Sequence, residues 1–521
     1  MDQGSPQKQW LQWVGLGLGP ILCAVCLWLL PNEFRTLDAS GGSTVAEFSW
    51  AGRATLAVMV WMGVWWLTEA IHISATALLP IVMFPLLGVA TLDDACFPYA
   101  DPLVFLYFGG FVLALSMERW GLGKRIALRT LQVIGTSASS MIAGFMLVTA
   151  VLSAFVSNTA TTAMMLPIAL SVISLLRRQI ENDADDKTSG VAAANQFGTC
   201  LLLSIAYSAS VGGIMTVIGT PTNAFLVGFL KKSIAAEFQQ DMSFARWLPI
   251  GVPLVITFLP AMYFVLTRLL FPIKQVKLHG GKELIDREMQ QLGSVKRGEW
   301  NTFLVFLCVV TLWLSRPVLN GLEIDWSGRT FQPLASLSDS GIAMAGALLL
   351  FLIPVSITRR QFTMDWSTAE RLPWGILFLF GGGLSLAAAV KTNGVAEFIG
   401  SQAGIFGELP PLVLVLIVTA SIVFLTELTS NAATTASLVP VLAALAPGLG
   451  VHPYLLIFPA TIASSFAFML PVATPPNAIV FGSGAITIPQ MVRAGFWLNL
   501  MAIIFVTALT VLVIKPWLGI R

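Results

Sequence analysis

Long apolar runs, separated by short polar segments, dominate the pattern of hydrophobic and polar positions along the chain. A helix of about 20 apolar residues is long enough to cross a bilayer. The runs lie near residues 10–31, 53–72, 74–92, 102–117, 140–175, 196–230, 247–271, 301–318, 340–357, 373–390, 411–447, 454–483 and 491–517. The pattern therefore predicts an all-α polytopic membrane protein.

Two of these runs, 140–175 and 411–447, are too long for one span and carry polar residues at their centres. We interpret each as a re-entrant hairpin, two helices that enter the membrane and return to the same side. The other runs then predict about 11 spanning helices.

Two further runs are interrupted by proline and polar residues. Gly219-Thr220-Pro221-Thr222-Asn223 lies inside 196–230, and Ala473-Thr474-Pro475-Pro476-Asn477 lies inside 454–483. Proline removes a backbone donor and clashes with the preceding turn, so each helix should break there. A proline kink would explain one such stretch alone. Paired interruptions in matching positions favour a transporter's binding site instead.

The hairpin tips are also matched. Ser157-Asn158-Thr159-Ala160-Thr161-Thr162-Ala163 resembles Ser430-Asn431-Ala432-Ala433-Thr434-Thr435-Ala436, and Phe108-Gly109-Gly110 precedes the first as Phe380-Gly381-Gly382 precedes the second. The order of Gly-rich helix, hairpin and broken helix thus occurs twice. Five predicted spans separate the hairpins, and this odd number gives the halves opposite orientations, so we predict an inverted repeat.

Composition and charge support and orient this picture. The chain of 521 residues is 56% hydrophobic and 11% charged, whereas soluble domains carry about 25% charged residues. Most of its 29 lysines and arginines fall in the segments on the N-terminal side of the predicted membrane, above all in 268–300. The positive-inside rule then predicts an inner-membrane protein with a cytoplasmic N-terminus and an external C-terminus.

The four interruptions carry Ser, Thr and Asn but neither Lys nor Arg. Helix N-termini suit a carboxylate, and unwound carbonyls suit Na⁺. An anion would be held by neutral dipoles, and bound cations would make its affinity depend on the ion gradient. The threonines could equally serve helix packing. Glu427 either orients the second tip or pairs locally, and the sequence leaves this open.

These motifs resemble the divalent anion–sodium symporter (DASS) family, the INDY-type dicarboxylate transporters. The resemblance rests on Ser157-Asn158-Thr159, its Ser-Asn-Ala partner, Gly-Thr-Pro-Thr-Asn, and Pro471-Val-Ala-Thr-Pro-Pro-Asn-Ala-Ile-Val-Phe481, and it covers about residues 50–517. It implies a homodimer in the lipid bilayer, elevator-type alternating access, and Na⁺-coupled uptake of succinate, malate or fumarate. Some members of the family carry citrate or sulfate.

The resemblance also implies site residues. One Na⁺ site would comprise Ser153, Ser157, Asn158 and Gly219, and the other Thr426, Thr429, Asn431 and Ala473. The dicarboxylate would meet Ser157, Asn158, Thr159, Thr220, Ser430, Asn431, Thr474 and Pro475.

It further implies a division into scaffold and moving parts. Scaffold helices would occupy 1–100, 231–357 (with the cytoplasmic linker 272–300) and 484–521. Transport elements would occupy 101–230, with hairpin 140–175 and broken helix 196–230, and 358–483, with hairpin 411–447 and broken helix 454–483.

One departure leaves alternatives open. Ala432 replaces the threonine usual in the family's second tip, so a sodium-independent dicarboxylate exchanger or a citrate or sulfate carrier remains an alternative. We predict no enzyme, because the spans hold no paired aspartates and no His-Glu zinc motif. A channel would not explain opposed hairpins with polar tips, and nothing in the sequence indicates a nucleic-acid partner.

Overall fold

The computed structural model describes residues 6–37, 43–135, 137–182, 187–273, 280–326, 329–332, 334–403 and 409–520. These residues are overwhelmingly helical, which confirms the predicted fold class. The strands in this part form three antiparallel pairs at the ends of helices. They are β1 (Glu33–Leu37) with β2 (Ser43–Glu47), β3 (Ile324–Trp326) with β4 (Arg329–Phe331), and β5 (Pro354–Ser356) with β6 (Gln361–Phe362).

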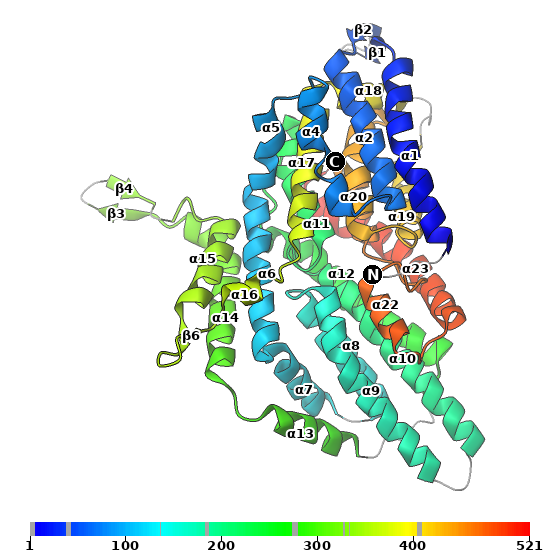
Figure 1. Ribbon diagram of the computed structural model, residues 1–521, viewed down its shortest axis with the longest axis vertical. Coiled ribbons are helices and arrows are strands. Elements are labelled where there is room, and N and C mark those ends of the chain that lie inside the picture. The colour runs from blue at the N-terminus through cyan, green and yellow to red at the C-terminus, as the bar shows by residue number, and fades with distance from the viewer. Residues whose placement is uncertain are drawn as a thin grey trace.

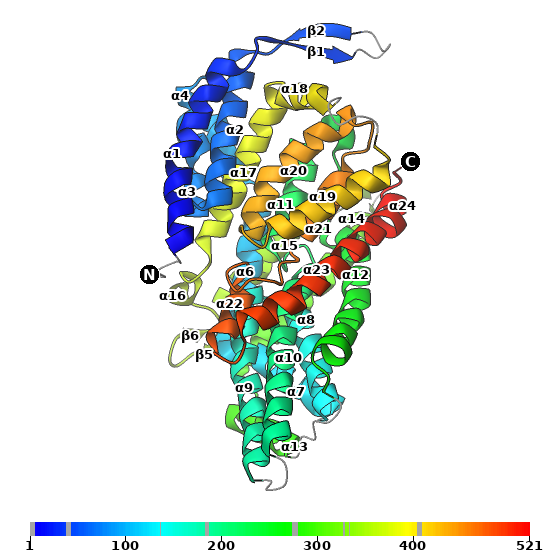
Figure 2. The same ribbon diagram turned by 90° about the vertical axis from the view of Figure 1, so that its right-hand side faces the viewer.

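The molecule is elongated, with β1 and β2 at one end and the far ends of α9 and α10 at the other (Figures 1 and 2). Helices outside the hairpins and the interrupted runs are α1 (Pro6–Leu29), α2 (Trp50–Thr68), α3 (Ile73–Thr76), α4 (Leu79–Leu86), α5 (Leu92–Cys96), α6 (Pro102–Trp120), α7 (Leu122–Ile134), α12 (Phe244–Phe264), α13 (Gly281–Leu292), α14 (Arg297–Asn320), α15 (Asp339–Leu352), α16 (Trp366–Ala369), α17 (Trp374–Thr392), α18 (Val395–Ser401), α23 (Ile488–Leu509) and α24 (Lys515–Trp517).

Seven helical segments of the described residues are long and apolar enough to cross a membrane. They are Gln9–Leu29, Leu92–Trp120, Asn158–Ile180, Phe244–Leu270, Arg297–Asn320, Trp374–Thr392 and Ile488–Trp517. Shorter apolar helices lie at Ile73–Leu86, Ala138–Ser153, Asp339–Leu352, Pro411–Leu425 and Tyr454–Ala463. These lengths are those of a protein that passes through a bilayer repeatedly.

Each predicted hairpin consists of two helices joined by a short turn. The first pairs α8 (Ala138–Ser153) with α9 (Asn158–Asn182), and the second pairs α19 (Pro411–Leu425) with α20 (Asn431–Gly448). In both hairpins the returning helix begins at the asparagine of the Ser-Asn motif. The sequence repeat therefore marks two equivalent helix starts.

The two interrupted runs are broken where proline occurs. Helix α10 (Lys187–Gly213) ends before the first break, Ile214–Thr220, and α11 (Pro221–Gly228) follows it. Helix α21 (Tyr454–Ala463) ends before the second break, Ser464–Thr474, and α22 (Pro475–Gly482) follows. Pro221 and Pro475 occupy the first helical position, where a missing N–H costs no hydrogen bond.

The two halves interlock. Helix α22 of the second half packs against α9 and α10 of the first, while α11 of the first half packs against α20 and α21 of the second. Each broken helix also packs on its own hairpin, α10 against α8 and α9, and α21 against α19 and α20. Figure 1 shows α22 beside α10. The crossed packing brings tips and breaks from both halves into one region.

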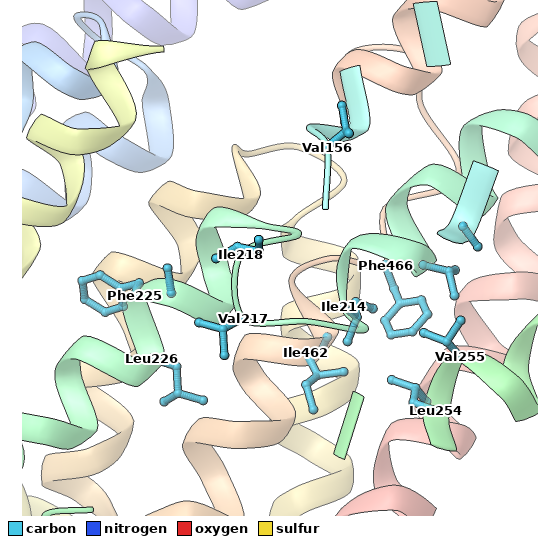
Figure 3. Packing of buried hydrophobic residues seen from close by; sticks show 14 of the residues in the cluster. Val156, Ile214, Val217, Ile218, Phe225, Leu226, Leu254, Val255, Ile462 and Phe466 are labelled. Atoms are coloured by element: carbon cyan, nitrogen blue, oxygen red, sulfur yellow. The ribbon is translucent and has the colours of Figure 1, made fainter. Parts of the chain in front are cut away.

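A cluster of buried apolar side chains packs against the first break. Ile214 and Val217 lie beside Ile462 and Phe466 of the second half, with Leu254 of α12 next to Phe466 (Figure 3). All five side chains are buried. Burial of this apolar surface helps to fix the position of a loop whose backbone makes only a few turn hydrogen bonds, such as that from Met215 N to the Gly212 carbonyl at 3.0 Å.

The basic linker 272–300 is tied to the helix that follows α6. Arg125 of α7 pairs with Glu299 at 2.5 Å, and Lys124 pairs with Glu288 of α13 at 3.0 Å. Residues 274–279 of this linker lie outside the described residues. The two ion pairs thus join α7 to α13 and to the first turn of α14.

Candidate functional site

At the first tip, two oxygen atoms lie within hydrogen-bonding distance of one serine hydroxyl and compete for its single proton. Ser153 Oγ lies 2.6 Å from Asn158 Oδ1 and 2.7 Å from the carbonyl oxygen of Ala209. A serine hydroxyl has one proton and can donate to only one of them. The other oxygen is left facing the serine oxygen without a proton between them.

Glycines let more oxygens approach this point. A Cβ on Gly213 would lie 2.7 Å from Asn158 Oδ1 and 3.1 Å from the carbonyl oxygen of Gly219. A Cβ on Gly219 would collide with the carbonyl oxygen of Gly213 and lie 3.0 Å from that of Ala154. Carbonyl and amide oxygens that converge on one small volume suit a cation such as Na⁺.

The second tip repeats the arrangement. Thr426 Oγ1 lies 2.7 Å from Asn431 Oδ1 and 3.0 Å from the carbonyl oxygen of Ser464. Thr435 donates to the Asn431 carbonyl at 2.9 Å, as Thr162 donates to that of Asn158 at 2.8 Å in the first tip. The matched threonines therefore hold the first turn of each returning helix.

The structure separates the predicted Na⁺ ligands into two groups. Ser153, Asn158 and Gly219 meet in the first cluster, and Thr426 and Asn431 meet in the second. Ser157 is exposed, and its hydroxyl accepts from Ala160 N at 3.2 Å. Two further predicted ligands bond elsewhere: the Thr429 hydroxyl lies 2.6 Å from that of Thr434, and Ala473 N donates to the Leu470 carbonyl at 3.2 Å.

The predicted substrate residues line the starts of four helices. Thr159 and Pro475 are exposed, and Ser430 is half-buried. Thr220 and Thr474 are buried directly before α11 and α22, where Thr474 Oγ1 accepts from Asn477 N at 3.3 Å and Tyr107 donates to the Thr220 carbonyl at 3.0 Å. The exposed members offer hydroxyl and helix-end groups to a ligand, and the buried members shape the backbone behind them.

The starts of α9, α11, α20 and α22 are linked through the two breaks. Asn158 of α9 lies against Gly213, and Thr222 of α11 contacts Ser465. Thr435 of α20 contacts Ser464, and Asn477 of α22 donates to the Ala467 carbonyl. Each N-terminus carries unpaired N–H groups and a partial positive charge, which together suit a carboxylate. The arrangement can therefore bind an anion without a basic side chain.

The asparagines of the two breaks hold the loops. Asn223 Nδ2 donates to the Thr216 carbonyl at 2.8 Å, and Asn477 Nδ2 donates to the carbonyls of Ala467 and Leu470 at 3.0 Å each. Their amide N–H groups are thus used inside the protein, while their Oδ1 atoms are buried without a hydrogen-bond partner. The threonine–proline–asparagine match therefore has a structural role in holding the breaks.

Glu427, whose role the sequence left open, orients the second break. Its carboxylate is buried and accepts from the backbone N–H of Phe468 at 2.6 Å, of Met469 at 2.9 and 3.0 Å, and of Leu470 at 3.1 Å. Asn499 Nδ2 of α23 donates to it at 2.7 Å.

Two of the polar contacts between the halves involve the second break. Thr222 and Ser465 bring their hydroxyl oxygens within 3.2 Å, and Tyr207 of α10 donates to the Phe468 carbonyl at 2.8 Å. Among the described residues, no group of three His, Cys, Asp or Glu side chains could hold a metal ion. Cation binding at the tips would therefore rest on neutral oxygen atoms.

Solved structures with a similar arrangement of helices are transport proteins. MtrF of Neisseria gonorrhoeae superposes with a TM-score of 0.57 and 11% identity over 96% of each chain. The YdaH transporter of Alcanivorax borkumensis gives 0.52 and 13% over 99% of this chain and 98% of its own. At such low identity the likeness concerns the fold alone.

Sequence relatives are much closer. The profile of the "Sodium:sulfate symporter transmembrane region" family matches residues 45–520. The sodium-dependent dicarboxylate transporter SdcS of Staphylococcus saprophyticus is 39% identical over 510 residues, and SdcS of Staphylococcus aureus is 38% identical, each match covering 98% of this chain and 92% of the relative. The chain therefore belongs to the sodium:sulfate symporter (DASS) family of membrane transporters, as its motifs predicted.

Proposed function

We propose that this protein is a secondary transporter that uses the Na⁺ gradient to take up C4-dicarboxylates such as succinate, malate and fumarate. The observation that carries the proposal is the excess of neutral oxygens at Ser153, Asn158 and Gly219, placed beside four helix N-termini. The names of the SdcS relatives support both the ion and the substrate class.

Two Na⁺ ions would bind at the two tips. Ser153, Asn158 and Gly219, with the carbonyls of Ala154 and Gly213, fit the first ion. For the second ion, Thr426, Asn431 and the Ser464 carbonyl are the ligands that the contacts support best. Ser157, Thr429 and Ala473 border these clusters and complete the set that family resemblance implies.

The dicarboxylate would lie between the tips. One carboxylate would meet Asn158, with Ser157, Thr159 and Thr220 near it, and the other would meet Asn431, with Ser430, Thr474 and Pro475 near it. Because no lysine or arginine lies in these motifs, Na⁺ would supply much of the positive charge that the dianion needs. Loss of Na⁺ would then release the substrate, which is the basis of coupling.

The proposed movement follows from the two-part architecture. Residues 101–230 and 358–483 would form the moving transport elements, and 1–100, 231–357 and 484–521 would form the scaffold that pairs the protein into a homodimer. Both hairpins would be re-entrant, and about 11 helices would span. The joined halves at Thr222–Ser465 support a site that moves as one body, as elevator-type access requires.

For orientation, we propose a cytoplasmic N-terminus and an external C-terminus. Helix α13 lies at the end opposite β1 and β2, and α24 lies nearer to β1 and β2 than the start of α1 does (Figure 2). A cysteine replacing Glu283 of α13 should react with impermeant maleimide only from the cytoplasmic side, and one replacing Gly519 only from outside. Reaction of both from one side would contradict this topology.

Uptake of labelled succinate into proteoliposomes tests the function. Accumulation should require an inward Na⁺ gradient and should fall with unlabelled malate or fumarate. Uptake that is unchanged when choline replaces Na⁺, and that requires internal dicarboxylate, would instead identify a sodium-independent exchanger. Inhibition by citrate or sulfate but not by malate would identify a citrate or sulfate carrier of the same family.

A further inference from the structure

The two halves hold their breaks by different means. In the first half, Thr216 Oγ1 donates to the carbonyl of Ala154, three residues before Ser157. In the second half the corresponding position, three residues before Ser430, is Glu427, and its carboxylate accepts from the break's own N–H groups. The first break is thus tied to its hairpin tip by a neutral hydroxyl, and the second break is tied to its tip by a buried carboxylate.

The carboxylate answers a specific need of the second break. If the two Thr-Pro motifs are aligned, α21 should end at Ala467, but it ends at Ala463, about one turn earlier. The earlier end leaves the N–H groups of Phe468, Met469 and Leu470 without helical acceptors. Glu427 accepts from all three, and bonds to an ionised acceptor are roughly twice as strong as neutral ones.

The first break has no charged support; neutral donors hold it, with Trp247 donating to the Ile214 carbonyl at 2.9 Å, Asn223 to that of Thr216 at 2.8 Å and Tyr107 to that of Thr220 at 3.0 Å. Its distinctive feature is the set of oxygens from Asn158, Gly213, Gly219 and Ala154 that lie around one volume, of which the Gly213 carbonyl accepts from Asn223 Nδ2 at 3.3 Å and the Ala154 carbonyl from Thr216. Partial negative charges at this separation repel one another unless a cation lies among them. Thr216, which donates to Ala154 and accepts from Gly219 N at 3.1 Å, supplies a single proton.

We propose that Glu427 is a positioning residue that keeps the second break folded in the absence of Na⁺, so that Na⁺ binding orders chiefly the first break. The inference rests on the proposed binding of Na⁺ at the tips. It assigns unequal tasks to two halves that look equivalent in sequence. The second half is a preformed part of the substrate site, and the first half completes the site only when its cation is bound.

Hydrogen exchange measured by mass spectrometry, on the full-length protein in nanodiscs, tests this directly. When Na⁺ replaces choline, exchange in residues 214–220 should slow about tenfold, and exchange in 464–474 should change by less than about twofold. Equal responses of the two segments, or a response confined to 464–474, would overturn the inference.

Glu427→Gln removes the charge and replaces one acceptor by a donor that faces backbone N–H groups. Exchange in 464–474 should rise about tenfold without Na⁺ and should become Na⁺-sensitive, while 214–220 behaves as in the wild type. The half-saturating Na⁺ concentration should rise more than that of succinate. Glu397→Gln, on the exposed face of α18, loses the same charge and should change none of these readouts.

A merely structural role of Glu427 predicts a different result, with exchange rising across the whole chain. If Glu427→Gln does not fold, Asn499→Ala removes one donor to the same carboxylate and should raise exchange in 464–474 about threefold. Unchanged exchange there in both variants would refute the proposal. Succinate uptake distinguishes a failure of the proposed function from a failure of the role assigned to Glu427. If the wild type showed no Na⁺-dependent uptake, the proposed function would be contradicted, whatever the exchange pattern.

Discussion

A single methyl group at Gly213 tests whether the first cluster binds Na⁺. In Gly213→Ala the new Cβ would stand 2.7 Å from Asn158 Oδ1 and 3.1 Å from the Gly219 carbonyl oxygen. Ordinary carbon–oxygen contacts are several tenths of an ångström longer, so at least one of the oxygens must move away. Alanine is acceptable at a helix end, and Gly213 has no left-handed backbone to lose.

The size of the effect follows from the oxygens displaced. An interaction of a polar group with a charged partner contributes about 1.5–3 kcal/mol. Losing one such ligand should therefore weaken Na⁺ binding about tenfold to a hundredfold. The loss should appear as a raised half-saturating Na⁺ concentration, because alanine improves helix propensity and the folded state keeps its other contacts.

Succinate uptake at graded Na⁺ concentrations measures this, with melting temperature recorded in choline. Gly482→Ala is the matched control, since a Cβ there meets no atom within 4 Å. It should leave the Na⁺ dependence unchanged. If Gly213→Ala transported with wild-type Na⁺ dependence, the oxygens near Gly213 would not be cation ligands, and the assignment of the first site would be wrong.

Three further outcomes are expected. Asn158→Ala and Asn431→Ala should each abolish uptake at normal membrane abundance, because both amides lie in the oxygen clusters; near-normal uptake would exclude that asparagine from the site. Ala432→Thr adds a hydroxyl to a half-buried helix start and should lower the half-saturating succinate concentration about tenfold; identical competition profiles would mean that position 432 does not face the substrate. Burial lowers the pKa of His452, so the unfolded chain binds the proton more tightly. Stability should fall below about pH 6.5, and His452→Gln should reduce that fall in melting temperature.

The sequence located the breaks because proline acts through local geometry. Pro221 and Pro475 cannot sit inside a helix without losing a hydrogen bond, so a helix must begin at each of them. The repeat then identified the two tips as a pair. Each of the runs 140–175 and 411–447 is divided into two helices, and both breaks lie inside the runs where the prolines placed them.

The partners of the tips could not be predicted in the same way. Ser153 meets the carbonyl of Ala209, and Thr426 meets that of Ser464, each far along the chain. A carbonyl oxygen is present in every residue, so no residue type marks the position. The sequence shows that a glycine, Gly213, precedes the break. Only tertiary packing shows that its missing side chain makes room for Asn158.

Glu427 shows what a sequence can and cannot say about a buried charge. A carboxylate inside an apolar run is costly unless donors surround it, so its presence alone predicts a set of donors nearby. Their identity was hidden, because three are backbone N–H groups and the length of unwinding that frees them is not encoded by the prolines. Yet the matching position holds Ala154, and this difference between similar tips implies that the second break has N–H groups that need a charged acceptor where the first break does not. Departures from symmetry within a repeat thus deserve a physical explanation as much as the repeat itself, and here the explanation is a longer break held by a fixed charge.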